Sequence, residues 1–384
     1  MTDINRKILI LICLLILFKV CSSFAEQEEK IPGQETIIPP LEITNVRVTP
    51  KVFDPTRGED VIISYYLSRP AKSIVGIFDP QMYLVRELLG RDYQKAGKVE
   101  IIWDGRDSRN HVIPDEAYFI RIEAYDSKQG ITRYDPTNSI RERMLNLEVH
   151  FDEHRNLITY DLANDARVKI QAGISKGGPL LKTIVNWKPQ LAGTHRELWD
   201  GRDESGNILL VNQPGFGIFG QTLGLPETSI IARGNGRYSY FEYSKEIFPE
   251  RPKKTSIDQR YTDSAQWLGL PLRMPVFGTA KPVFSLEMPR HLKRTAGGLP
   301  IVRGKVPLTI RLDKNIKRHI LEQQFEIICY VDFRFVRETE EGYSPAIWMW
   351  DSAKFPSGEH ILTVNVATLN GQVTSSSLKV WVEN

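Results

Sequence analysis

The chain has 384 residues, of which 41% are hydrophobic and 25% charged, and its formal net charge is +3. This length is too great for one ordinary domain and suits about three, and the composition is that of folded globular proteins. The small net charge gives no reason to expect nucleic acid or an anionic membrane surface as a partner.

Residues 1–25 are expected to be an export signal. Arg6 and Lys7 precede an unbroken apolar run at residues 8–18, and Ser23-Phe24-Ala25 offers a small-residue cleavage site. The run is shorter than the roughly 20 residues that a spanning helix needs. We therefore predict export by a Sec-type signal, cleavage after Ala25, and no membrane-spanning segment in the processed chain. The destination would be the periplasm, the cell surface or the medium.

Two alternatives for this signal stay open, a retained membrane anchor and a lipoprotein acylated on Cys21. A lipobox has small or aliphatic residues before its cysteine, whereas Phe18-Lys19-Val20 precedes this one. Cleavage after Ala25 would leave Cys329 as the single cysteine, without a partner for an internal disulfide. Its apolar neighbours two and four positions away indicate a core-facing residue rather than a reactive thiol.

Alternating strands follow a leader at residues 26–42, which is polar, contains prolines and is expected to be flexible. Alternation of apolar and polar residues is the period of a strand that buries one face. The first strand has four apolar positions two apart, Val61, Ile63, Tyr65 and Leu67. A similar strand with Ile158, Tyr160 and Leu162 follows about 95 residues later. The predicted fold is all-β, with tandem immunoglobulin-like or fibronectin-III-like β-sandwiches.

A tryptophan-containing pentapeptide marks the same point in two repeats. Trp103-Asp104-Gly105-Arg106-Asp107 returns 96 residues later as Trp199-Asp200-Gly201-Arg202-Asp203, and an Ala-Gly pair precedes each copy. The tryptophan supplies a large buried side chain, and Asp-Gly supports a tight turn because glycine accepts a positive φ. The repeat predicts one domain at residues 43–143 and a second, more divergent one at residues 144–235.

The landmarks of the first copy resemble the FlgD-type Ig-like repeat, named for the flagellar hook-capping protein and widespread in exported bacterial proteins. They are Phe53-Asp54-Pro55, the strand Ile63-Ser64-Tyr65-Tyr66-Leu67, the tryptophan pentapeptide, and Ala117-Tyr118-Phe119. The second copy lacks the Phe-x-Pro opening and has Gly215-Phe216-Gly217 near its end. The resemblance implies an Ig-like sandwich. Hook-cap proteins leave through the flagellar export apparatus, whereas this chain has a Sec-type signal, so we expect a shared module rather than a shared role.

Residues 236–282 interrupt the alternation with five prolines and many aromatic side chains. Two interpretations stay open: a connector whose aromatics pack on the neighbouring domains, and a loop that binds a partner. For the second interpretation, the expected contact residues are Tyr238, Tyr240, Tyr243 and Trp267.

Alternation resumes in residues 283–384, which predict a C-terminal Ig-like domain. Its clearest strand carries Val306, Leu308, Ile310 and Leu312. The phrases Trp350-Asp351-Ser352 and Gly358-Glu359-His360 resemble the W-D-(S/T)…G-x-H turn of other bacterial Ig-like domains. Trp381 lies between two core-facing valines and is expected to point outward, where it could contact a partner.

Three motifs with chemical meaning have a better structural explanation. His150-Phe151-Asp152-Glu153-His154 fits the letters of a zinc-protease motif, but the residues before it alternate like a strand rather than a helix. The glycines at 215–220 fit a dinucleotide motif without a helix after them. The Asp-rich turns after Trp103 and Trp199 could hold calcium, but their spacing favours plain turns. The sequence therefore identifies no catalytic residue, no cofactor site and no metal site.

The leading functional hypothesis is a non-catalytic structural or interaction protein of the bacterial envelope or exterior, with a protein as its partner. The alternative is a carbohydrate-binding module or an accessory of a glycan-processing system, in which exposed tryptophans contact sugars. Trp381 is the first candidate for that role, and Trp187 and Trp267 are further ones.

Overall fold

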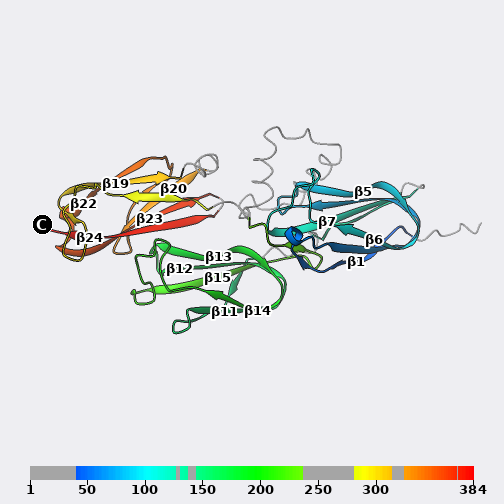
Figure 1. The fold of residues 1–384 in the computed structure, drawn as a ribbon, viewed down its shortest axis with the longest axis horizontal. Coiled ribbons are helices and arrows are strands. Elements are labelled where there is room, and N and C mark those ends of the chain that lie inside the picture. Colours follow the sequence, from blue (N-terminus) through cyan, green and yellow to red (C-terminus); the bar gives the residue numbers. More distant parts are fainter. Residues whose placement is uncertain (1–39, 127–129, 137–143, 237–280, 314–323, 370) are drawn as a thin grey trace, which may run out of the picture. The chain divides into compact units, whose positions relative to one another are not determined.

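The structure is a computed structural model that describes residues 40–126, 130–136, 144–236, 281–313, 324–369 and 371–384. These residues contain β-strands and short 3-10 helices but no α-helix, and the strands form three β-sandwiches (Figure 1). The all-β prediction is confirmed. Among the described residues, no helix is long and apolar enough to cross a membrane.

Sandwich 1 has a small sheet of strand order β1-β3-β6 and a large sheet of order β2-β16-β7-β4-β5, in which β8 also pairs with β7. Its elements are β1 (Ile43–Thr49), β2 (Val52–Phe53), η1 (Pro55–Arg57), β3 (Val61–Leu67), β4 (Ala71–Phe78), β5 (Leu84–Gln94), β6 (Gly97–Trp103), β7 (Glu116–Tyr125), β8 (Ile131–Tyr134) and β16 (Ile230–Ala232).

Sandwich 2 has a small sheet of order β10-β11-β14 and a large sheet of order β13-β12-β15-β9. Its strands are β9 (Leu145–Leu147), β10 (His150–Asp152), β11 (Leu157–Leu162), β12 (Ala166–Ile174), β13 (Leu180–Gln190), β14 (Gly193–Leu198) and β15 (Phe216–Gly224).

Sandwich 3 has a small sheet of order β17-β19-β22 and a large sheet of order β18-β24-β23-β20-β21. Its elements are β17 (Phe284–Glu287), β18 (Ile301–Val302), β19 (Lys305–Leu312), β20 (Phe325–Val331), β21 (Arg334–Thr339), β22 (Ala346–Asp351), η3 (Ser352–Lys354), β23 (Gly358–Thr368) and β24 (Val373–Val382).

Strand β16 closes sandwich 1, although it follows sandwich 2 in the chain. It pairs parallel with β2 and antiparallel with β7, and in sandwich 3 the final strand β24 pairs in the same way with β18 and β23. Residues 230–232 thus supply the last strand of sandwich 1, and strands β9–β15 lie in the chain between β8 and that strand. The sequence repeat places these residues at the end of the second domain, and the division of the chain at 143 and 235 stays a prediction.

The cores follow the predicted alternation. On β3, the four positions from Val61 to Leu67 that were expected inside are buried, as are the expected positions of β11 and β19. Each small sheet packs these side chains against its large sheet, so that each sandwich has its own apolar cluster. Cys329 is buried in the cluster of sandwich 3, which confirms its expected place in the core.

The outward orientation that the glycan hypothesis requires of Trp187 is wrong. The pairing of β12 with β13 shifts register between Val168 and Ile170, and Trp187 takes a left-handed φ of 48° at this bulge. The ring is buried, because the buried positions of β13 recur at period two from Leu181 through Val185 to Trp187. It packs with Leu223 and lies 5.5 Å from the Lys169 Nζ.

Candidate functional site

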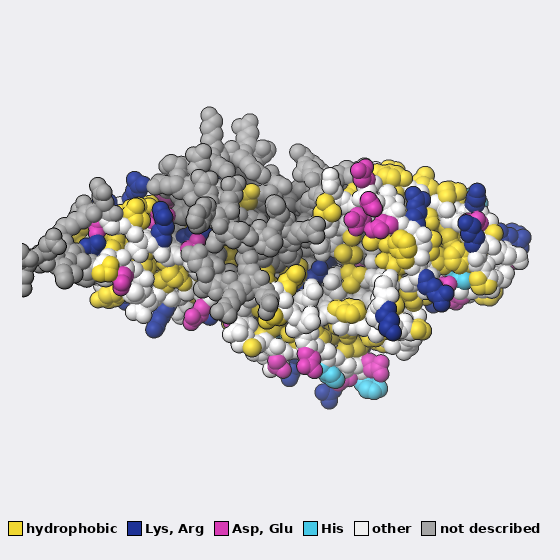
Figure 2. All heavy atoms as spheres, turned by 180° about the vertical axis from the view of Figure 1, so that it is seen from behind, with side chains coloured by type: hydrophobic (Ala, Val, Ile, Leu, Met, Phe, Trp, Pro, Cys, Tyr) yellow, Lys and Arg dark blue, Asp and Glu magenta, His cyan; other side chains and the backbone are white. Residues whose placement is uncertain are grey.

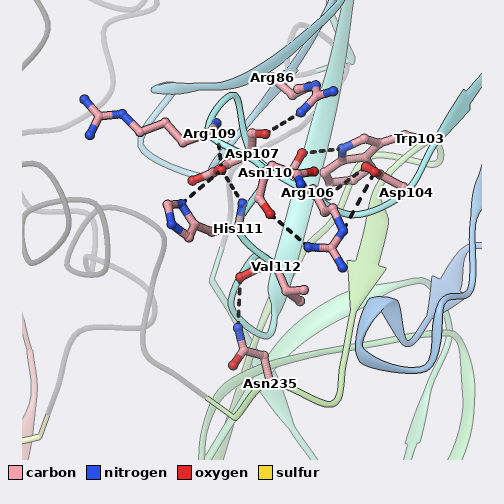
Figure 3. Close-up of polar contacts among 10 residues, drawn as sticks. All are labelled: Arg86, Trp103, Asp104, Arg106, Asp107, Arg109, Asn110, His111, Val112 and Asn235. Carbon is pink, nitrogen blue, oxygen red and sulfur yellow. Dashed lines mark hydrogen bonds and ion pairs between the residues drawn. The ribbon is translucent and has the colours of Figure 1, made fainter.

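The first tryptophan turn is a hydrogen-bonded corner of sandwich 1 (Figure 3). The indole N–H of Trp103 donates to the Arg106 carbonyl at 3.0 Å, and an Asp104 carboxylate oxygen accepts the Arg106 amide at 3.0 Å. The Arg106 guanidinium donates to the Asn110 carbonyl at 2.8 Å. Gly105 has a φ of 67°, and an added Cβ would lie 2.4 Å from the ring of Pro55, so only glycine fits this turn.

The second corner repeats these bonds at the same relative positions. Trp199 donates to the Arg202 carbonyl at 2.9 Å, and an Asp200 oxygen accepts the Arg202 amide at 3.0 Å. The Arg202 guanidinium donates to the Gly206 carbonyl at 3.3 Å. The arginine that follows each Asp-Gly pair is therefore a structural residue that ties the turn to its own main chain.

The remaining aspartates of both corners are also used within their loops. One Asp107 oxygen accepts the amides of Arg109 and His111, and one Asp203 oxygen accepts the Ile208 amide, each at 2.9 Å. Among the described residues, no group of three or more histidine, cysteine, aspartate or glutamate side chains is arranged to hold a metal ion. These contacts explain the Asp-rich turns as local structure.

Sandwich 3 has a corner of the same kind with different chemistry. Trp350 is buried against Phe355, with ring centroids 5.5 Å apart, but its indole N–H has no acceptor in the described part of the chain. His360 Nε2 lies 2.9 Å from the Pro356 carbonyl, four residues earlier. In sandwich 1, the Tyr118 hydroxyl donates to the Pro114 carbonyl over the same separation, as in the tyrosine corner of Ig-like folds.

A buried charged cluster joins strands of sandwiches 1 and 2. Glu116 of β7 contacts Arg167 of β12, and both side chains are almost completely buried. Burial raises the pKa of Asp79 to about 8, and repulsion by Glu116 adds to this, while hydrogen bonds from main-chain amides and the charge of Arg167 act against it. Such a carboxyl group can serve as an acid in an active site, but Asp79 is completely enclosed, which indicates a structural role.

Each small sheet exposes an apolar side chain directly before its corner tryptophan. The exposed fractions are 65% for Ile102, 80% for Leu198 and 52% for Met349. Apolar side chains on the face that Figure 2 shows lie among charged ones. We call the three residues the pre-tryptophan positions. The sequence could have predicted these positions, because successive side chains of a strand point to opposite faces of the sheet and the residue before a buried tryptophan therefore faces outward.

The predicted contact residues lie in two parts of the chain. Trp381, on β24, is 39% exposed and points away from the buried Val380 and Val382, as its alternation predicted. Tyr238, Tyr240, Tyr243 and Trp267 lie outside the described residues. The role of all five in partner binding stays a prediction.

The zinc-protease-like and dinucleotide-like motifs lie on strands and turns, as the sequence predicted. His150 begins β10, whereas His154 is in the turn after that strand, and both are exposed. The glycine-rich segment from residue 216 onward forms β15, which pairs along its length with β12. Neither segment has the helix that its enzymatic motif requires.

No protein-family model matches the chain, and no curated protein matches it. Among solved structures, fibronectin(III)-like modules of Clostridium thermocellum CbhA are similar, with 11% identity, a TM-score of 0.21, and coverage of 89% of this chain and 94% of that one.

Two adhesin structures are also similar. A tetra-tandem repeat from the extending region of a large adhesion protein has 12% identity and a TM-score of 0.19, with coverage of 89% of this chain and 74% of that one. A structure from a 1.5-MDa bacterial ice-binding adhesin has 12% identity and a TM-score of 0.18, with coverage of 90% and 99%. Assignment to the FlgD-type repeat in particular stays a prediction.

Proposed function

We propose that this chain is an exported, non-catalytic interaction protein of the bacterial cell envelope or exterior. Its Ig-like sandwiches present outward-facing side chains to a protein partner. Support comes from the pre-tryptophan positions, because an exposed apolar residue recurs at the corresponding place of all three small sheets. Apolar side chains at the centre of a contact lose water on binding and contribute most to affinity.

The surroundings of these positions suit a protein contact. Ile102 lies opposite Ile62 on β3, and Leu198 lies opposite Leu157 on β11, so each pair forms a small apolar area within a polar sheet face. Strands β6, β14 and β22 are each at one end of the strand order of their small sheets. Apolar centres with polar surroundings are usual for transient protein interfaces.

Photo-crosslinking in cells tests this proposal. A benzophenone amino acid replaces Ile102, Leu198 or Met349 in turn, and matched controls carry it at Lys72 or Lys188, which are exposed on the large sheets. We expect mass spectrometry to identify the same protein at two or more pre-tryptophan positions and at neither control. The absence of a crosslinked partner, or equal crosslinking at the controls, would contradict the proposal. Export is tested by sequencing the processed N-terminus, which we expect at Glu26.

A second candidate function, glycan binding, is favoured by the outward orientation of Trp381. Its neighbours across the strands are Glu359 and Ile301, so the indole face lies beside both polar and aliphatic groups. A glycan array tests this with the wild type and Trp381→Ala. Loss of binding in the variant would support the candidate, and unchanged binding would remove Trp381 from it.

A further inference from the structure

A cavity of about 690 Å³ lies where two loops of sandwich 2 meet the β20–β21 hairpin of sandwich 3. One side consists of the turn at residues 174–178 together with Gln213 and Pro214, and the other consists of residues 332–335 and Ile361. The volume is within the range of small-ligand sites, roughly 300–1,000 Å³. None of the motifs in the sequence indicated this cavity.

The hairpin turn that forms one wall is held in an unusual conformation. Asp332 and Phe333 have φ values of 49° and 64°, in a two-residue turn where Asn-Gly is the usual sequence. A bulky residue in the left-handed region is strained, because its Cβ approaches the following carbonyl oxygen. Strained residues of this kind occur often at ligand-binding sites. Phe333 packs against the apolar cluster of sandwich 2, so this wall is fixed from both sides.

The carboxylate in the turn is already occupied. One Asp332 oxygen accepts the Ile361 amide at 2.9 Å, and the other lies 2.6 Å from His360 Nδ1. Burial lowers the pKa of His360, but its contacts with the Pro356 carbonyl and with Asp332 outweigh this and raise it. Both Asp332 oxygens are therefore engaged by groups of sandwich 3, although the side chain is 45% exposed and lines the cavity.

Two cations of the lining have no such partner. Lys176 and Arg334 are exposed, and within the described part of the chain neither side chain has a hydrogen bond or an ion pair. The lining therefore carries two cations against one carboxylate, that of Asp332, which makes the cavity electropositive. A carboxylate is the natural partner for a lysine and an arginine that face one cavity.

The other lining groups suit a ring that carries hydroxyl groups. Phe335 is 57% exposed and is braced by Tyr330, with ring centroids 6.3 Å apart. An exposed aromatic ring can cover the apolar C–H face of a sugar. Ser175 and Gln213 each donate to a main-chain carbonyl, at 2.8 and 3.1 Å, so their free oxygen lone pairs can accept hydrogen bonds from hydroxyl groups.

We propose that this cavity binds a carboxylate-bearing saccharide, with the sugar ring against Phe335 and its carboxylate between Lys176 and Arg334. The hydroxyl groups of the sugar donate to Ser175 and Gln213. The inference rests on the proposed function in one respect, that the chain is a binding module. It adds the chemical class of one ligand, and it does not depend on Trp381 or on the pre-tryptophan positions.

An extended peptide that adds to β21 is the main competing occupant, since β21 ends the strand order of its sheet. Exposed Arg337 and Glu338 on that strand are charges of the kind that protect an edge against strand addition. The observations therefore favour the saccharide, and the peptide becomes an outcome of the test.

Titration calorimetry with the full processed chain tests the proposal. The probes are short oligosaccharides that carry galacturonate, glucuronate or sialate, each with its neutral counterpart, and an acidic peptide of alternating Asp and Thr. We expect at least one carboxylated saccharide to bind at least tenfold more tightly than its neutral form, and its affinity to fall with added salt. Lys176→Gln/Arg334→Gln should weaken this binding at least tenfold, and Phe335→Ala should weaken it without a change in Tm.

The matched control is Lys98→Gln/Arg303→Gln, which removes two exposed cations outside the cavity and should bind like the wild type. Three results would overturn the proposal: no carboxylated saccharide binds, neutral and carboxylated forms bind equally, or the cavity variant binds like the control. Binding of the acidic peptide alone would also overturn it and assign the cavity to peptides. None of these results affects crosslinking at the pre-tryptophan positions, so the two proposals fail independently.

Discussion

Ile230→Ala should destabilise sandwich 1, although the residue follows sandwich 2 in the chain. Ile230 is completely buried in the apolar cluster of sandwich 1, and its strand pairs with β2 and β7. The substitution removes three carbon atoms at about 0.8 kcal/mol each, and the cavity left behind adds to the cost. We expect a loss of about 3 kcal/mol in the free energy of unfolding of sandwich 1, within the usual range for such substitutions.

Hydrogen exchange measured by mass spectrometry separates the sandwiches. A loss of about 3 kcal/mol corresponds to roughly 100-fold faster exchange through global opening, since 1.4 kcal/mol is a factor of ten. The acceleration should be greatest in β7, and smaller in β12. The control Ile170→Ala truncates a buried residue of the sandwich 2 cluster and should show the reverse order. If Ile230→Ala accelerated β12 and left β7 unchanged, residues 230–232 would belong energetically to sandwich 2, and our assignment of β16 would be refuted.

Three further predictions concern buried polar groups. The folded pKa of Asp79, about 8, is above the roughly 3.9 of an unfolded aspartate, so the folded chain holds an extra proton between these pH values and its stability should fall as pH rises through them. Asp79→Asn should flatten this pH dependence of the free energy of unfolding, measured in urea at pH 5 to 9. Equal slopes for the variant and the wild type would contradict the assigned pKa. Glu116→Gln removes the carboxylate charge that contacts the buried Arg167, and it should cost about 3 kcal/mol in urea unfolding. Glu100→Gln, at an exposed pair, should change stability by less than about 0.5 kcal/mol. Similar costs for the two variants would refute the importance of the buried pair. Trp103→Phe removes the indole hydrogen bond to the Arg106 carbonyl, whereas Trp350→Phe removes no such bond within the described residues. Thermal unfolding should therefore show a loss of stability about 1 kcal/mol greater for Trp103→Phe. Equal losses would argue against a stabilising role of that bond.

Much of each sandwich could be predicted from side-chain alternation and from the corner tryptophans. The buried face of β3 and the outward orientation of Trp381 follow from period two alone, because an antiparallel sheet with one buried face needs it. The turn at Gly105 follows from the local preference of Asp-Gly. These features depend on residues close together in the chain, so one sequence is enough to reveal them.

Other features depend on contacts between distant residues and have no local signal. Three apolar residues at 230–232 form a strand anywhere that a free edge accepts them, and the sequence does not say that the edge belongs to sandwich 1. The cavity residues Lys176 and Arg334 are 158 positions apart, and each resembles an ordinary surface cation.

The order of strands also determines how this molecule would respond to mechanical tension. A pull on the chain at its two ends enters sandwich 1 through β1 and leaves it through β16, since everything from β9 to β15 lies between two attachments to sandwich 1. Sandwich 2 would therefore carry no force until β16 is torn from β2 and β7. Only then would its 80 residues, from 145 to 224, join the stretched path.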